Sequence, residues 1–355
     1  MVDKAGPTRP ADKMSEEKGK GRRVTLASVA QAAGVSLPTV SKVVNGHPDV
    51  APQTRVLIER LLLQHEYVPR QARRTNSLPP VLDLAFDRLD SWYSLEIVRG
   101  VTEAAREAGA DVVVAQTPAD PTGQAWSRKL ATAGRVGLIL VTSTLTVDQW
   151  RHFHDARVPV VVIDPVEVPD DSVPSIGATN WAGGVAATEH LLQLGHRRIA
   201  TVVGRPQSFC GRARLHGYRA ALDAAGVEAD PELVRYGDFG FEKAYEGALE
   251  LLDLPDRPTA IFATSDFQAF GVVEAARVRS LRVPQDLSVV GFDDLSISRW
   301  AAPPLTTVRQ PLVRMGRVAC QTLLRLAAGE SLESDRMELA TQLVVRESTT
   351  PPRGL

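Results

Sequence analysis

The spacing of hydrophobic and polar positions changes three times along the first 80 residues. Residues 1–22 contain almost no apolar residue, whereas apolar residues recur at helical intervals from Val24 to Tyr67. The segment 69–80, PRQARRTNSLPP, is again poor in apolar residues and carries three prolines. This pattern predicts a disordered tail over 1–22, a small helical domain over 23–69 and a linker over 70–80.

Beyond the linker, short apolar runs alternate with amphipathic stretches. The runs are Val81–Phe86, Asp111–Ala115, Val136–Val141, Val158–Ile163, Ile199–Val203, Thr259–Ala263 and Leu287–Phe292. The helical patterns include Leu95–Ala108, Gly183–Leu194, Gly211–Ala225, Glu242–Leu252 and Phe267–Val278. Short buried strands that alternate with longer helices predict parallel sheets covered on both faces. The length of this region favours two such sheets over one. We therefore expect a two-lobed α/β domain over 81–345 and a tail over 346–355.

The first domain has capping and turn residues at the positions expected of a helix-turn-helix. Thr25 can cap a first helix, Gly34 supplies a tight turn, and Ser36 can cap a second helix over Leu37–Val44 that ends at Asn45. In this motif the second helix enters the major groove of DNA.

The sides of the predicted helices divide into core and surface. The side chains expected to face the core are Val40, Val43 and Val44 of the second helix and Val56, Ile58, Leu61 and Leu62 of a third helix over 52–65. The side chains left to face DNA are Leu37, Pro38, Ser41, Lys42 and Asn45.

Charge is distributed unevenly along the chain. Residues 1–74 carry 13 Lys/Arg and 7 Asp/Glu, whereas residues 75–355 carry 28 and 35, so the net charge of −1 conceals a basic front and an acidic body. A basic front indicates a polyanionic partner, although charge alone is equally consistent with a solvated tail.

The composition excludes several classes of protein. No run of about 18 apolar residues exists to span a membrane, and residues 1–23 lack the apolar core of a signal peptide. Two cysteines cannot form a disulfide framework, which favours a reducing, cytoplasmic location. The body lacks a Walker phosphate loop, an HExxH motif, cysteines at metal spacing and a GxSxG elbow. We expect neither an enzyme nor a bound cofactor or metal.

The stretch VTLASVAQAAGVSLPTVSKVVNGHPDVAPQTR resembles the N-terminal headpiece of the lactose/galactose-repressor family of bacterial transcription regulators. The resemblance implies that the second helix reads bases while neighbouring hydroxyls and the third helix hold the DNA backbone. Lys42 stands where many members carry Arg, so it offers guanine one ammonium instead of a bidentate fork. The expected DNA-contacting residues are Thr25, Ser36, Leu37, Pro38, Thr39, Ser41, Lys42, Asn45, Thr54 and Arg55, with Arg70, Arg73 and Arg74 of the linker.

The body resembles the same family through the segments RRIATVVG, GRARLHGYRAAL, TAIFATSD, VPQDLSVVGFDDLS and PPLTTVRQP, in that order. The implied fold is an all-α headpiece followed by a periplasmic-binding-protein-like effector domain of two Rossmann-like subdomains. In such sheets ligands bind beyond the carboxyl ends of the strands. Asp164 and Asp293 each follow an apolar run, and Arg214 and Gln310 match the family's ligand-binding arginine and late glutamine.

Other residues complete the predicted effector site. Six aromatic residues gather near strand or turn ends, where they could stack on sugar rings: Trp92, Tyr93, Trp181, Phe209, Phe239 and Phe241. The predicted effector-binding set is Trp92, Tyr93, Asp164, Asn180, Phe209, Arg214, Phe239, Ser265, Asp293 and Gln310. The alternatives are structural: the carboxylates could cap helices or form loop ion pairs, and Arg214 could join the two subdomains. Cys210 is expected to be an inert thiol that lines a pocket or the core.

The combined interpretation is a cytoplasmic repressor that binds a palindromic double-stranded DNA operator as a homodimer and is released by a sugar or oligosaccharide. A purine corepressor is the second hypothesis, because the purine-binding branch of the family shares Arg214 and Asp293. A sugar-binding transport protein is a remote third, because the chain has a DNA-binding headpiece and no signal peptide.

The linker supplies a testable departure from the family. Many members insert an apolar wedge into the minor groove at the position of about Asn76, and an amide cannot unstack a base step as Leu can. We expect Arg70, Arg73 and Arg74 to grip phosphates or a narrow minor groove instead. Replacing Arg73 and Arg74 together by Ala should flatten the salt dependence of operator binding by roughly two counterions. Circular-permutation gel shifts should show little bending. An unchanged salt slope or a strong kink would contradict this hypothesis.

Overall fold

The structure, a computed structural model, describes residues 26–44, 50–64, 79–89, 91–118, 122–167 and 173–353. The chain divides into two compact units, residues 1–78 and 79–355.

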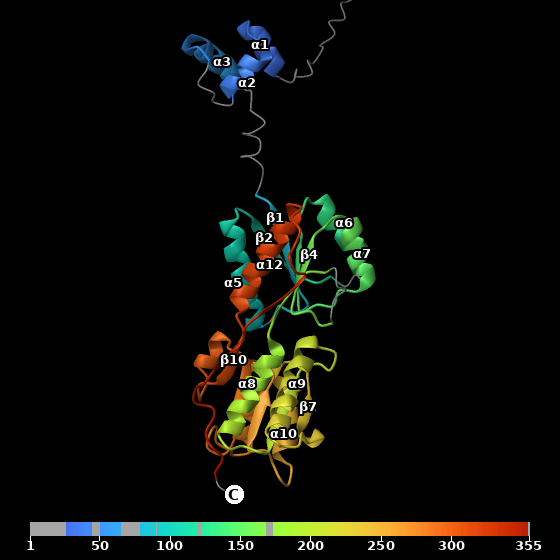
Figure 1. The fold of residues 1–355 in the computed structure, drawn as a ribbon, viewed down its shortest axis with the longest axis vertical. Coiled ribbons are helices and arrows are strands. Elements are labelled where there is room, and N and C mark those ends of the chain that lie inside the picture. Colours follow the sequence, from blue (N-terminus) through green and yellow to red (C-terminus); the bar gives the residue numbers. More distant parts are fainter. Residues whose placement is uncertain are drawn as a thin grey trace, which may run out of the picture. The chain divides into compact units, whose positions relative to one another are not determined.

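The first unit contains the predicted helix-turn-helix (Figure 1). Helix α1 (Leu26–Ala33) is followed by α2 (Leu37–Val44) and α3 (Pro52–Gln64). Gly34 makes the turn between α1 and α2 with φ of +64°, a conformation that glycine adopts without strain. The Thr39 amide donates to Ser36 Oγ at 3.3 Å, so Ser36 caps α2 as expected.

A small apolar core holds these three helices together. It is formed by Val29, Ala30, Val40, Val43, Val50 and Ile58, with Leu61 and Leu62 packed against it. The expectation that Val56 joins this core is wrong, because its side chain is 54% exposed. Val56 lies two residues before Ile58, and this places it about 200° around the helix, away from the buried side. The side chain of Val44 lies outside the described residues.

The second unit is built from two lobes, each a six-stranded sheet with helices on both faces. Lobe 1 has the strand order β11-β5-β4-β3-β1-β2, and every neighbouring pair is parallel. Its strands are β1 (Val81–Phe86), β2 (Asp111–Gln116), β3 (Leu138–Val141), β4 (Val160–Ile163), β5 (Ser175–Ala178) and β11 (Arg336–Leu339). Its helices are α5 (Trp92–Glu107), α6 (Gln124–Thr132), α7 (Val147–Asp155) and α12 (Leu312–Ala327). Helices α5 and α12 lie side by side on one face, and α6 and α7 cover the other (Figure 1).

Lobe 2 repeats the plan with the order β12-β10-β9-β8-β6-β7, in which only β12 is antiparallel to its neighbour. Its strands are β6 (Ile199–Val203), β7 (Val234–Tyr236), β8 (Ala260–Ala263), β9 (Ser288–Asp293), β10 (Thr306–Arg309) and β12 (Gln342–Val344). Its helices are α8 (Asn180–Gln193), α9 (Phe209–Ala224), α10 (Phe241–Leu252) and α11 (Asp266–Val278). Two 3-10 turns, Pro231–Leu233 and Ser296–Arg299, precede β7 and β10.

The predicted strands and helices of the body occur within a few residues of their expected bounds, and the two-sheet prediction is confirmed. The sequence pattern did not indicate β5, β7, β10, β11 or β12. Each of these strands has only three or four residues and contains a polar or charged one, whereas the equally short β3, β4 and β8 are entirely apolar.

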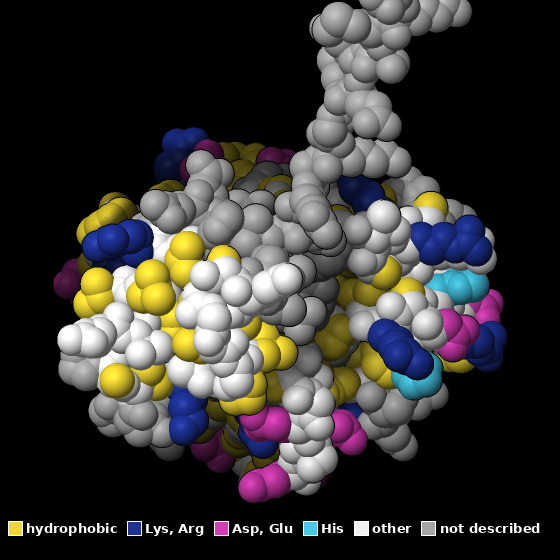
Figure 2. All heavy atoms as spheres, turned by 90° about the horizontal axis from the view of Figure 1, so that it is seen from above, with side chains coloured by type: hydrophobic (Ala, Val, Ile, Leu, Met, Phe, Trp, Pro, Cys, Tyr) yellow, Lys and Arg dark blue, Asp and Glu magenta, His cyan; other side chains and the backbone are white. Residues whose placement is uncertain are grey.

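The two histidines of α7, His152 and His154, lie on different sides of the helix. Phe153 lies between His152 and His154 and is fully buried, so the helix turns neighbouring side chains to different sides. Charged and histidine side chains gather over α6 and α7 (Figure 2), where Arg151 pairs with Asp148 at 2.9 Å.

The chain crosses between the lobes three times, after β5, after β10 and after β11. The first and third crossings are hydrogen-bonded to each other. Thr179 and Thr341 join hydroxyls at 2.9 Å, and the Thr179 amide donates to Leu339 O at 3.0 Å. The first and third crossings therefore form one hydrogen-bonded hinge instead of two separate connections.

The residues after Val345 do not behave as the expected tail as far as they are described. Ser348 is fully buried in lobe 2. Its hydroxyl donates to Val289 O at 2.6 Å and accepts from the Thr306 amide at 2.8 Å. The segment 346–353 is thus part of the packing of lobe 2.

Ser348→Ala should lower the free energy of unfolding by about 2 kcal/mol, because it leaves a buried amide without its acceptor. Val345→Ala is the matched control, since Val345 is exposed and should change stability by less than about 0.5 kcal/mol. Urea denaturation measures both. Equal losses in the two variants would contradict a structural role for the segment.

Candidate ligand-binding site between the lobes

The predicted DNA-contacting side chains that are described lie mainly on α2. Leu37, Pro38 and Lys42 are exposed, and Thr39 and Ser41 are half-buried. Ser36 Oγ and Thr39 Oγ1 are 2.8 Å apart, so these two hydroxyls already interact. Thr54 and Arg55 are half-buried on α3. The remaining predicted residues, Thr25, Asn45, Arg70, Arg73 and Arg74, lie outside the described residues.

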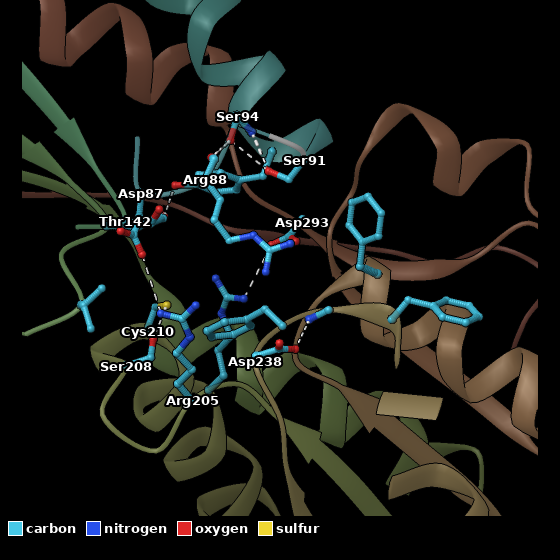
Figure 3. A pocket seen from close by; sticks show the side chains of 18 of the residues that line it. Asp87, Arg88, Ser91, Ser94, Thr142, Arg205, Ser208, Cys210, Asp238 and Asp293 are labelled. Atoms are coloured by element: carbon cyan, nitrogen blue, oxygen red, sulfur yellow. Dashed lines mark hydrogen bonds and ion pairs between the residues drawn. The ribbon is translucent and has the colours of Figure 1, made fainter. Parts of the chain in front are cut away.

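A cavity of about 390 Å³ lies between the two lobes. This is within the usual range for small-molecule sites, roughly 300–1,000 Å³. Most lining side chains follow the carboxyl ends of strands or open the next helix (Figure 3). From lobe 1 these include Asp87, Arg88, Ser91, Tyr93, Ser94, Thr142 and Asp164. From lobe 2 they include Arg205, Ser208, Cys210, Arg214, Asp238, Phe239, Phe241, Glu242, Phe267 and Asp293.

Arg214 is the most heavily constrained of these side chains. It is 3% exposed, and its Nε donates to Asn180 Oδ1 at 2.8 Å while Nη1 donates to Thr264 O at 2.5 Å. The guanidinium also lies 3.8 Å from the ring centre of Phe292. These contacts fix a planar fork of donors at the floor of the cavity.

Close packing of α8 against α9 places Arg214 at this point. A Cβ on Gly184 would overlap the carbonyl group of Arg214, and a Cβ on Gly217 would overlap the carbonyl of Trp181. The two glycines therefore allow the helix backbones to approach closely, which brings the arginine under the cleft.

Two buried carboxylates accompany the arginine. Asp293 Oδ1 lies 3.6 Å from Arg214 Nη1 and accepts from Gln310 Nε2 at 2.7 Å. Asp164, in lobe 1, accepts from Tyr93 Oη at 2.6 Å. Burial raises the pKa of Asp164, while the Tyr93 hydrogen bond and the charge of Arg214 oppose the rise.

Asp266 lies behind Asp293 and does not line the cavity. It accepts from the Leu295 amide at 2.8 Å, from Ser298 Oγ at 2.6 Å and from Thr307 Oγ1 at 2.5 Å. Burial and the charge of Asp293 raise its pKa to about 8. Burial raises the pKa of Asp293 only to about 6, because Arg214 opposes it. Burial thus raises the pKa of both carboxyl groups, and the charge of Arg214 limits the rise at Asp293.

Backbone strain is concentrated around the cavity. Thr142, Asp164, Phe239 and Asp293 line it with positive φ angles of 49°, 45°, 67° and 119°. Non-glycine residues rarely adopt this region, and such strain clusters at binding sites, where the surrounding structure holds it in place.

The predicted effector residues fall into three groups. Tyr93, Asp164, Arg214, Phe239 and Asp293 line the cavity. Asn180, Ser265 and Gln310 instead hold lining residues, since they bond Arg214, the Phe239 carbonyl and Asp293 respectively. Trp92 and Phe209 are partly exposed and do not line this cavity, and Cys210 lines it as expected.

Several lining residues were missed in the sequence. Asp87, Thr142 and Arg205 closely follow β1, β3 and β6, so the rule that pointed to Asp164 would have found them. Arg88, Asp238 and Glu242 come from loops or a helix start, for which the periodicity holds no signal.

Metal sites and membrane-spanning helices were also sought among the described residues. Within them, no group of three or more His, Cys, Asp or Glu side chains could hold a metal ion. Among the helices that the structure describes, none is both long and apolar enough to cross a membrane.

Comparisons with known proteins agree with this architecture. Residues 25–70 match the family described as bacterial regulatory proteins, lacI family, and residues 188–349 match a periplasmic binding protein-like domain. The HTH-type transcriptional regulator CelR of Thermobifida fusca is 37% identical over 336 residues, which cover 92% of this chain and 98% of that relative. The chain belongs to the lacI family of bacterial regulatory proteins.

Further relatives place this lacI-family protein among transcription regulators. The ribose operon repressor of Escherichia coli (strain K12) is 33% identical over 331 residues, which cover 91% of this chain and 99% of the relative. A solved complex of the transcriptional regulator CelR with cellobiose is 37% identical with a TM-score of 0.69, covering 92% of this chain and 100% of that one. A lac repressor dimer bound to operator and the anti-inducer ONPF is 29% identical with a TM-score of 0.68, covering 93% and 100%. The protein is therefore a DNA-binding transcription regulator and not an enzyme.

The raised pKa of Asp293 in this lacI-family protein predicts an unusual pH dependence of stability. The folded state keeps the proton up to about pH 6, whereas an unfolded Asp releases it near 3.8. Folded protein thus binds more protons between these values, and the contribution of Asp293 to stability falls as pH rises from 4 to 6. Between pH 4 and 6, the free energy of unfolding of Asp293→Asn, measured by urea denaturation, should rise by roughly 2 kcal/mol relative to that of wild type.

Asp286→Asn is the control with the opposite sign. Hydrogen bonds from Arg282 lower the pKa of Asp286, so its stabilising effect is present above pH 4 and is lost as pH falls below it. Parallel pH profiles for Asp293→Asn and wild type would show that Asp293 is not the buried, proton-retaining group described here.

Proposed function

We propose that this lacI-family protein is a repressor released from a palindromic operator by a sugar, and that a disaccharide such as cellobiose is the first effector to test. The observation that carries the proposal is the cavity between the lobes, into which one buried guanidinium and two buried carboxylates project. The likeness to CelR, which has been solved with cellobiose, supports the choice of sugar.

The chemistry of the cavity favours a neutral polyhydroxylated ligand. Five carboxylates line it, namely Asp87, Asp164, Asp238, Glu242 and Asp293, together with three arginines, Arg88, Arg205 and Arg214. Carboxylates accept from sugar hydroxyls and guanidinium groups donate to them, and the excess of five carboxylates over three arginines disfavours an anionic ligand. The rings of Tyr93, Phe239, Phe241 and Phe267 add apolar surface for the C–H faces of a sugar.

Operator binding as a homodimer is the second part of the proposal. Helix-turn-helix dimers place two recognition helices about one turn of DNA apart, which matches a palindromic site. The lac repressor relative is described as a dimer bound to operator, and this chain covers that whole relative. A second headpiece, supplied by a second copy, would let α2 read both half-sites.

Release would follow from linkage between sugar binding and DNA binding. A sugar that binds one arrangement of the lobes more tightly shifts the population toward it, by an amount set by the difference in affinity. The hydrogen bond of Thr179 with Thr341 joins two of the crossing segments, so a change at the cavity would act on both together.

Arg214→Ala should abolish release of the operator by cellobiose. The variant loses charge-assisted contacts to the sugar, worth about 2–3 kcal/mol or more, which corresponds to an affinity loss of roughly 30- to 150-fold. Fluorescence anisotropy of labelled operator, titrated with cellobiose, measures the release. The variant's unfolding curve checks that loss of response is not loss of fold.

Two controls decide between the parts of the proposal. An operator with one half-site should bind far more weakly than the palindrome if the protein reads DNA as a dimer. Guanine and hypoxanthine test the corepressor hypothesis, since a purine that tightens operator binding while sugars do nothing would replace sugar induction. If cellobiose releases the Arg214→Ala variant from the operator at the same concentration as wild type, Arg214 is not a sugar-binding residue.

A further inference from the structure

Asp294 lies next to the cavity residue Asp293 but does not line the cavity itself. Its side chain is 1% exposed and is held between two arginines. Arg309 Nε donates to Asp294 Oδ2 at 2.6 Å, and Arg346 Nη2 donates to Asp294 Oδ1. A buried carboxylate with one cation on each oxygen is held firmly in place, because breaking either pair would leave a charge without its partner.

Both arginines are fixed to strand β10 of lobe 2. Arg309 is the last residue of β10 and pairs with Asp293 in the ladder between β9 and β10. Arg346 follows β12, and its backbone amide donates to Thr306 Oγ1, at the start of β10, at 2.9 Å. The carboxylate of Asp294 is therefore tied to the sheet of lobe 2. We call its two ion pairs the Asp294 clamp.

The clamp lies at a strained bend of the backbone. Asp293 and Asp294 are consecutive non-glycine residues with positive φ angles, 119° and 57°. Such conformations persist only where surrounding contacts hold them. Beyond the bend, the Leu295 side chain is fully buried in the apolar core of lobe 1, and Ser296 Oγ donates to Glu96 Oε1 of α5 at 3.0 Å. The bend therefore joins a strand of lobe 2 to contacts made in lobe 1.

Three contacts tie this bend to lobe 2. Gln310 Nε2 donates to Asp293 before the centre of the bend, and the Leu295 amide donates to Asp266 after it. The clamp holds Asp294 between these two hydrogen bonds. Both partners are charged in the clamp, whereas the other two bonds have neutral donors, so the clamp is the stronger restraint.

We propose that Asp294 is a positioning residue of the sugar site. The clamp keeps the bend with lobe 2, and this holds the carboxylate of Asp293 at the cavity (Figure 3), 3.6 Å from Arg214 of the same lobe. Without the clamp the strained bend relaxes, and Asp293 and Arg214 no longer face one ligand together. This inference rests on the proposed sugar-binding function and adds a residue that sets affinity without touching the sugar.

Isothermal titration of the full-length protein with cellobiose tests this role. Asp294→Asn removes the charge but keeps the shape of the side chain, and it should raise the dissociation constant about tenfold. Arg309→Gln removes one half of the clamp at a side chain that is 43% exposed, and it should raise the constant about threefold. Arg309→Lys keeps a cation at this position and should return the constant to within about twofold of wild type.

Asp286→Asn is the matched control. Asp286 is also a carboxylate with two arginine partners, Arg282 at 2.7 Å and Arg353 at 2.9 Å. It precedes β9, at the end of that strand away from the cavity, whereas Asp294 follows β9. Asp286→Asn should lower stability in urea denaturation and leave the dissociation constant of cellobiose within about twofold of wild type. Loss of stability alone would then not explain the effect of Asp294→Asn.

Asp294→Gly separates the clamp from the conformation of the backbone. Glycine adopts a positive φ without strain, so this variant can keep the bend but has no carboxylate to hold it. It should bind cellobiose as weakly as Asp294→Asn does.

The outcomes keep the two proposals apart. Cellobiose affinity within about twofold of wild type in both Asp294→Asn and Arg309→Gln would overturn the positioning role and leave sugar binding intact. Wild-type affinity in Asp294→Gly would overturn it as well, and so would an equal loss in Asp286→Asn. If Asp294→Asn does not fold, the comparison of Arg309→Gln with Arg309→Lys decides. If wild type binds no member of the cellobiose or maltose series by calorimetry, the proposed function fails and the positioning role fails with it.

Discussion

A guanidinium group buried between two lobes needs partners for its donors, and the second unit supplies them at Nε and Nη1. Arg214 takes an amide oxygen from Asn180 and a backbone carbonyl from Thr264, and it faces the carboxylate of Asp293. Removing such a group from water is costly unless its hydrogen bonds and charge are matched. The close contact of α8 with α9 at Gly184 and the strained backbone at Asp293 are both conditions for that match.

The same arrangement explains why the pKa values of two neighbouring carboxyl groups are raised to different extents. Asp293 faces Arg214, whereas Asp266 is surrounded by hydroxyl and amide donors and has no cation among its partners. Burial favours the neutral form of both, and the arginine shifts the balance for one only. Asp293 therefore faces the cavity beside Arg214, while Asp266 behind it accepts from the Leu295 amide and Ser298 Oγ and so holds the 3-10 turn Ser296–Arg299.

Sequence reasoning located the site where strands end, because the carboxyl edge of a parallel sheet is determined by the order of strands and helices alone. Asp164, Arg214 and Asp293 were found in this way or through family spacing. Trp92 and Phe209 show where such reasoning stops. Each adjoins a lining residue, Tyr93 or Cys210, on a helix, and successive helical side chains diverge by about 100°, so one of each pair turns away from the cavity. Loop residues such as Asp238 carry no periodic signal, and the very short strands β5, β10 and β11 carry too little.

The groups that hold the ligand-facing charges also belong to the crossings between the lobes. Asn180, which orients Arg214, follows Thr179 of the first crossing, and Gln310, which orients Asp293, lies in the second. The third crossing is bonded to the first through Thr341. A change in the positions of Arg214 and Asp293 therefore acts directly on the first and second crossings. It reaches the third crossing through its hydrogen bond with the first. Coupling of this kind needs no long chain of contacts, because the site and the hinge share side chains.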